Sequence, residues 1–101
     1  MKEQKIQTWH PEKGKKNQNI SLEKYQLIKS AILNVLKYSE PTHTQLMQEL
    51  IKILKEKFQD NIMWYGITVK LDLEARKIIE RTNSKPPIYR LILKTTKVKK
   101  S

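Results

Sequence analysis

The chain has no cysteine, and glycine occurs only at Gly14 and Gly66 in 101 residues. The absence of cysteine excludes a disulfide framework and a thiolate metal site. A glycine-rich loop that wraps a phosphate needs more glycine than two isolated residues provide. No segment approaches the roughly 18 consecutive apolar residues of a membrane span, and residues 1–19 lack the apolar stretch of a signal peptide. We therefore expect a soluble protein of the cytoplasm with no membrane partner.

Sequence signatures of catalysis are also missing. The nucleotide-binding patterns G-x-x-x-x-G-K and G-x-G-x-x-G, the metalloprotease pattern H-E-x-x-H and the redox pattern C-x-x-C do not occur. The two histidines, His10 and His43, are far apart in the sequence, and a metal site built on them would need carboxylates that no pattern identifies. His43 with Glu40 or Asp72 could be drawn as an acid–base pair, but such residues occur in almost any chain of this size. The sequence therefore predicts no enzyme, no cofactor and no metal.

The charge balance is strongly basic, with 21 Lys and Arg residues against 10 Asp and Glu and a net charge of +11. The excess is uneven, because residues 1–20 carry a net +3 and residues 94–101 carry +4, while the long stretch between them carries only +4. Basic ends attract polyanions, including nucleic acids. They also keep a small protein soluble, so the charge alone leaves both interpretations open.

Two amphipathic helices form the first part of the predicted domain. Ser21 is a suitable N-cap for a helix over residues 22–38, in which apolar residues recur at spacings of three and four. Thr42 and Gln45 form a T-x-x-Q capping box, which opens a second amphipathic helix over residues 43–58.

The segment after the second helix has two interpretations. From Ile67 to Ala75 apolar and polar residues alternate, which by periodicity alone favours a β-strand. The same stretch is rich in good helix formers, so we predict a helix that starts near Met63 or Tyr65 and ends near Lys77. In that case the helix is apolar on two sides and must be covered on both. Inside this third helix, Asp72 and Arg76 form an i, i+4 pair of opposite charge.

A β-hairpin is predicted to follow the third helix. Residues 78–81 and 89–93 then read as two strands. The turn between them, over residues 83–87, contains a proline pair, which suits an exposed loop better than a strand interior.

The run from Leu73 to Arg81, L-E-A-R-K-I-I-E-R, resembles the L-E-x-x-G-L-I-x-R segment of winged-helix transcription regulators of the multiple-antibiotic-resistance type. A longer string that ends in V-K-L-D-L-E-A-R resembles a small uncharacterised family of bacterial winged-helix proteins. The resemblance covers residues 20–93. It implies an α+β, winged helix-turn-helix fold with three helices and a two- or three-stranded wing sheet.

This resemblance divides the chain into three expected parts. They are a basic N-terminal arm over residues 1–20, a winged-helix domain over 21–93 and a lysine-rich C-terminal tail over 94–101. One residue departs from the regulator pattern, because Lys77 occupies the position of the glycine that ends the third helix there. Glycine is favoured at such a position, because it adopts a left-handed conformation without cost.

In winged-helix proteins the third helix enters the major groove of DNA and the wing contacts the phosphate backbone. The resemblance therefore implies Thr68 and Lys70 as groove contacts of double-stranded DNA, and Arg81, Lys85 and Arg90 as wing contacts. Simpler alternatives exist for these residues. Lys70 could simply solvate its helix. Arg81 and Arg90 could lie near each other across the hairpin, with Glu80 balancing the charge of one of them.

The start of the third helix argues against base reading, which usually relies on Arg, Asn or Gln at that point. Residues 63–67 are instead M-W-Y-G-I. This apolar start fits a protein partner or self-association through Trp64, Tyr65 and Ile67. The resemblance and the basic charge nevertheless favour a DNA-binding, transcription-regulator-like protein, with a protein–protein interaction module on a winged-helix scaffold as the alternative. Trp9 either docks on the domain or stacks on bases.

Overall fold

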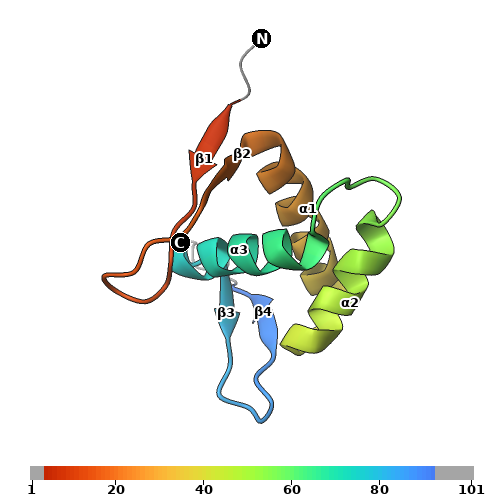
Figure 1. Cartoon of the computed structure of the whole chain (residues 1–101). Coiled ribbons are helices and arrows are strands. Elements are labelled where there is room, and N and C mark those ends of the chain that lie inside the picture. Colours follow the sequence, from red (N-terminus) through yellow and green to blue (C-terminus); the bar gives the residue numbers. More distant parts are fainter. Residues whose placement is uncertain (1–3, 93–101) are drawn as a thin grey trace, which may run out of the picture.

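The computed structural model describes residues 4–92, and the predicted lysine-rich tail over 94–101 lies outside them. Three helices and two small antiparallel hairpins make an α+β fold, in which α3 crosses the middle of the molecule between the hairpins (Figure 1). Within the described residues, no helix is long and apolar enough to cross a membrane. The elements follow the chain in the order β1 (Lys5–Gln7), β2 (Asn19–Ser21), α1 (Leu22–Tyr38), α2 (His43–Leu54), α3 (Ile62–Ala75), β3 (Ile79–Arg81) and β4 (Tyr89–Leu91).

The predicted caps of α1 and α2 are confirmed. The Ser21 hydroxyl accepts a hydrogen bond at 3.3 Å from a backbone N–H in the first turn of α1. At α2, the Thr42 hydroxyl accepts from Gln45 N–H at 3.2 Å, and the Gln45 side-chain oxygen accepts from Thr42 N–H at 3.0 Å. The second helix ends at Leu54, which is earlier than predicted, but Phe58 beyond it is still buried.

The ambiguous third segment is a helix, so the helical interpretation is confirmed. It starts at Ile62 because the side-chain oxygen of Asn61 caps it, accepting a hydrogen bond at 2.9 Å from the N–H three residues on. Gly66 lets α3 lie close to α2, since a Cβ there would stand 3.0 Å from side-chain atoms of Met47 and Leu50. The most deeply buried apolar side chains are Ile28, Ile32, Leu46, Leu50, Leu54, Val69, Leu73 and Ile79.

α3 ends in a left-handed turn at Lys77, whose φ is 65°. The N–H of Ile78 donates to the Leu73 carbonyl at 2.9 Å, and the N–H of Lys77 donates to the Glu74 carbonyl at 3.1 Å. This pair of bonds is the Schellman arrangement, in which glycine usually takes the left-handed position. The departure seen in the sequence therefore places a lysine in a strained conformation.

β3 and β4 form the predicted hairpin, with Glu80 opposite Arg90. An isolated bridge joins Thr42, just before α2, to Ile88, just before β4. The hairpin is thereby extended by one residue from a third segment, which ties the start of α2 to the C-terminal sheet. The last residue of the predicted second strand lies outside the described residues.

The N-terminal segment is part of the fold and not the separate arm that the sequence predicted. β1 and β2 pair antiparallel, and β2 runs across the expected boundary at residue 20 to end at Ser21. Thr8 and Ile20 are only 1% and 4% exposed, because the hairpin packs against the helices. Each strand is three residues long, so the segment has too few apolar positions for its pattern to be recognised.

Candidate functional site

Two of the predicted DNA contacts, Thr68 and Lys70, are buried, with exposed fractions of 4% and 6%. The Lys70 ammonium donates to the Tyr89 hydroxyl at 3.0 Å and lies 3.6 Å from the Glu74 carboxylate. Thr68 is covered by the N-terminal hairpin, whose Asn17 amide donates to the Thr68 carbonyl at 3.0 Å. Because packing occupies both side chains, neither reaches a DNA groove, and their assignment as nucleic-acid contacts is corrected.

The three predicted wing residues belong to the β3–β4 hairpin. The Arg90 guanidinium donates to the Glu80 carboxylate at 2.6 Å, which confirms that this glutamate balances one of the arginines. Arg81 and Lys85 are exposed, and within residues 4–92 neither forms an ion pair. The charge that this hairpin offers to a ligand is therefore that of Arg81 and Lys85.

The solvent-facing side of α3 is apolar, and we call it the α3 face. Met63, Trp64 and Ile67 are 45%, 42% and 38% exposed. Leu71, one turn further along, is partly exposed and completes the face. Tyr65, the other residue predicted to contact a partner, is partly buried. Its ring centre lies 5.2 Å from that of Phe58 and 4.8 Å from that of Trp64, both in edge-on geometry, so Tyr65 packs against Trp64.

On another side of α3, the fully buried Asp72 joins three elements. Its carboxylate accepts hydrogen bonds from the backbone N–H of Trp9 at 2.7 Å, from the Tyr25 hydroxyl of α1, and from Arg76 Nε at 2.8 Å. Burial and the bond to Asp72 raise the pKa of Tyr25, so its hydroxyl remains a donor at neutral pH. The i, i+4 pair noted in the sequence thus anchors the N-terminal hairpin.

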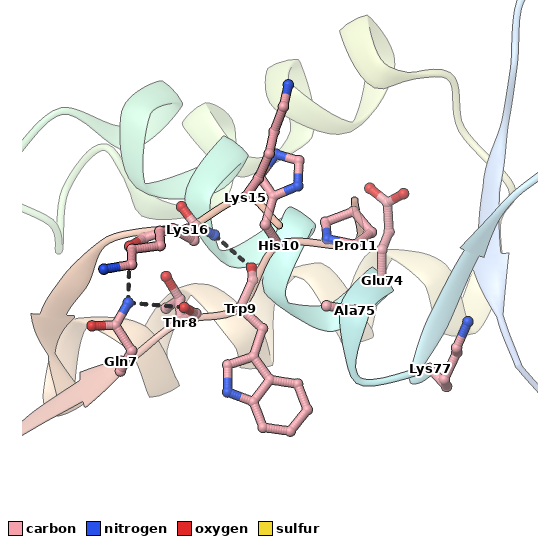
Figure 2. A pocket seen from close by; sticks show the side chains of 11 residues that line it. Gln7, Thr8, Trp9, His10, Pro11, Lys15, Lys16, Glu74, Ala75 and Lys77 are labelled. Atoms are coloured by element: carbon pink, nitrogen blue, oxygen red, sulfur yellow. Dashed lines mark hydrogen bonds between the residues drawn. The ribbon is translucent and has the colours of Figure 1, made fainter. Parts of the chain in front are cut away.

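Trp9 lies at a cleft of about 580 Å³ between the N-terminal hairpin and the end of α3 (Figure 2). The Arg76 guanidinium lies 4.1 Å from the centre of the indole, yet the residue is still 51% exposed. Trp9 therefore docks through its backbone and one ring face, as one of the two interpretations predicted. The cleft lining includes Thr8, His10, Pro11, Lys15, Lys16 and Lys77.

Sequence reasoning missed this cleft as a unit. Its residues come from segments about sixty positions apart, near Trp9 and near Lys77. No local pattern reports such an approach. The available signals were a tryptophan in an otherwise polar segment and the helical pair of Asp72 with Arg76.

The two histidines have separate local surroundings. His10 Nδ1 accepts a hydrogen bond from the Glu12 N–H at 3.0 Å, within the loop between β1 and β2. His43 is the first residue of α2, as predicted, and burial followed by the nearby Lys70 charge lowers its pKa. Among residues 4–92, no three side chains of metal-binding type gather closely enough to hold an ion.

These features define a small α+β protein with three helices, an apolar helix face and a basic, aromatic cleft. The chain belongs to a family of unknown function, DUF6958, whose model matches residues 5–89. That description names no activity, ligand or winged-helix relationship. No curated protein and no solved structure matches the chain. Since the match begins at β1, the N-terminal hairpin is part of what the family shares.

Proposed function

We propose that this chain is a protein-interaction module on a winged-helix scaffold, and that a partner protein binds the α3 face. The scaffold assignment is supported by the element order from α1 onward, which is helix, bridge, two helices and hairpin. In that order the Thr42–Ile88 bridge corresponds to the short strand before the second helix. α3 then corresponds to the helix that reads DNA in helix-turn-helix proteins.

The observation that carries the proposal is the apolar exposure of the α3 face in a protein of net charge +11. A DNA-reading helix presents polar and cationic side chains to base edges. Here Thr68 and Lys70 are on the packed side, and Met63, Trp64 and Ile67 meet solvent. Exposed aromatic and aliphatic residues on one face are typical of the centre of a protein interface.

The spacing of the α3 face indicates how a partner would bind. Met63, Ile67 and Leu71 recur every four residues, which is the anchor pattern of a helix that lies in an apolar groove. The ring of Tyr65 holds Trp64 in place, so little side-chain freedom is lost on binding. We therefore expect Trp64 and Ile67 to contribute most of the affinity.

A different protein is a better occupant of the α3 face than a second copy of this chain. Two copies would each bring a charge of +11, and this repulsion opposes self-association. A partner whose apolar groove has an acidic rim gains from both burial and charge.

Double-stranded DNA remains a second candidate partner because of one observation, the exposed Arg81 and Lys85 on the β3–β4 hairpin. Such residues can contact phosphates and contribute salt-dependent affinity without sequence preference. In this hypothesis the helix contributes no base contacts through Thr68 or Lys70.

Two isoleucines of equal exposure provide a matched test. Ile67 on α3 and Ile51 on α2 are both 38% exposed. Partners would be captured by a photo-crosslinking residue placed at position 63, which keeps Trp64 and Ile67 intact, then purified and titrated against Ile67→Glu and Ile51→Glu. We expect Ile67→Glu to weaken binding at least 10-fold and Ile51→Glu to leave it unchanged.

Equal behaviour of the two isoleucine variants would contradict the proposal. If instead the affinity for duplex DNA falls on Arg81→Glu with Lys85→Glu, while both isoleucine variants bind every partner normally, the DNA candidate is favoured.

A further inference from the structure

The indole of Trp9 is held in place although half of its surface is exposed. The backbone N–H of Trp9 donates to the buried Asp72 carboxylate at 2.7 Å, and the backbone carbonyl of Trp9 accepts from the Asn17 amide at 2.8 Å. One ring face lies against the Arg76 guanidinium, at 4.1 Å from the ring centre, and Arg76 is itself fixed by Asp72. The residue is 51% exposed, and the guanidinium covers one ring face, so the other face is the one that a ligand can reach.

Cations predominate around this ring; Glu74 also lines the cleft, but its carboxylate lies 3.6 Å from the Lys70 ammonium. The loop between β1 and β2 carries Lys13, Lys15 and Lys16, and Lys77 follows α3. Lys15 pairs with Glu12 at 3.2 Å, but both side chains are more than half exposed, so solvent and salt weaken the pair. Within residues 4–92, the other three lysines form no ion pair.

The arrangement of the lysines indicates an extended ligand and not a single small anion. In Figure 2 the Lys16 and Lys77 side chains lie on opposite sides of Trp9 and do not converge on one point. Both nevertheless line the same cleft. A chain of phosphates that crosses the ring would meet one cation before it and another after it.

The backbone at Lys77 supports the same conclusion. Its φ of 65° is unfavourable for a lysine and would suit glycine. Residues with a strained backbone conformation cluster at functional sites, such as those that hold a ligand. At Lys77 the side chain lines the cleft and supplies a cation.

From this geometry we infer that Trp9, Lys16 and Lys77 form a binding site for single-stranded nucleic acid, in which an unpaired base stacks on the open face of Trp9. Base stacking on aromatic rings beside a basic surface is the usual way of binding single strands. Bases in a duplex are already stacked and do not offer a free face. The site lies away from the α3 face, so it goes beyond the proposed protein contact and does not depend on it.

The test is a titration of the full chain with a labelled 12-nucleotide single strand of mixed sequence, as DNA and as RNA, across a salt series. The same strand in duplex form and poly-glutamate serve as comparison ligands. A Trp64→Phe background leaves Trp9 as the sole tryptophan, so quenching of its fluorescence reports stacking directly. We expect quenching by the single strands, and Lys16 and Lys77 should together contribute about −1.4 to the salt slope if each contacts one phosphate.

Matched variants separate stacking from charge and from folding. Trp9→Ala should weaken single-strand binding about 5- to 150-fold, the range for loss of one stacked base, and Trp9→Phe should retain part of it. Tyr38→Ala is the control, because Tyr38 is also an exposed aromatic residue, with Lys37 5.7 Å from its ring centre. That variant should bind like the wild type.

Three results would overturn the inference. They are wild-type affinity in Trp9→Ala, equal binding of duplex and single strand, and poly-glutamate binding as tight as the oligonucleotide. The last would indicate an acidic protein as the ligand. If Trp9→Ala does not fold, Lys16→Gln decides, since that side chain is exposed and its loss should weaken single-strand binding and reduce the salt slope. Ile67→Glu should leave oligonucleotide binding unchanged, so failure here says nothing about the α3 face.

Discussion

Replacing Lys77 by glycine removes a side chain and relieves a strained backbone at the same position. A left-handed conformation costs an L-residue roughly 1–2 kcal/mol, and Lys77 has a φ of 65°. Glycine avoids this cost but loses about 0.5–1 kcal/mol through its greater freedom in the unfolded chain. Taking the middle of both ranges, the expected net effect of Lys77→Gly is a gain of about 0.5–1 kcal/mol in the free energy of unfolding. For a domain of this size that is a rise of about 2–8 °C in Tm.

The companion variant Lys77→Ala keeps the strained backbone and removes the same charge. Urea unfolding followed by circular dichroism would compare both with the wild type, and Lys77→Ala should be unchanged within about 0.5 kcal/mol. Both variants should lose the same amount of single-strand affinity, so the more stable protein would bind less well. If Lys77→Gly is no more stable than Lys77→Ala, the strain at this helix end has been misjudged.

Two further predictions concern stability. Asp72→Ala should lower the free energy of unfolding by about 3–5 kcal/mol in urea titrations, because the Tyr25 hydroxyl, the Trp9 backbone N–H and the partly buried Arg76 guanidinium all lose their acceptor; a loss below about 1 kcal/mol would contradict this account. His43 has a lowered pKa in the folded protein, so the unfolded chain binds its proton more readily. The stability from neutral His43 is present above its ordinary pKa of 6.5 and is lost as pH falls below it. His43→Gln should flatten the dependence of unfolding free energy between pH 7.5 and 5, and an unaltered slope would refute the assignment.

Local signals predicted the parts of the fold that are determined locally. Ser21 and the Thr42–Gln45 capping box act through hydrogen bonds within one helical turn, so residue type and spacing sufficed. The hairpin and its Glu80–Arg90 pair depend on only about ten residues of chain. The left-handed position of Lys77 was indicated by the resemblance, which has glycine at that point of the pattern.

The candidate sites depended on contacts that no local pattern reports. Lys70 was expected to be exposed because lysine usually is, but its ammonium is buried and donates to the hydroxyl of Tyr89, 19 residues further along the chain. The hairpin around Trp9 was taken for an arm, since its folding depends on a carboxylate 63 residues away. Each case required knowledge of which distant segments meet.

The alternation of apolar residues that made α3 ambiguous also explains its two surfaces. A helix with this pattern has apolar residues on two sides, and both sides need cover. Val69 and Leu73 are buried in the core, where the other helices cover them. The N-terminal hairpin covers the neighbouring side near Asp72, towards the end of the helix. Trp64 and Ile67 at its start are still 42% and 38% exposed within the described part of the chain. The sequence therefore retains apolar residues at positions where its own fold does not use them, which is the reason to expect that a partner does.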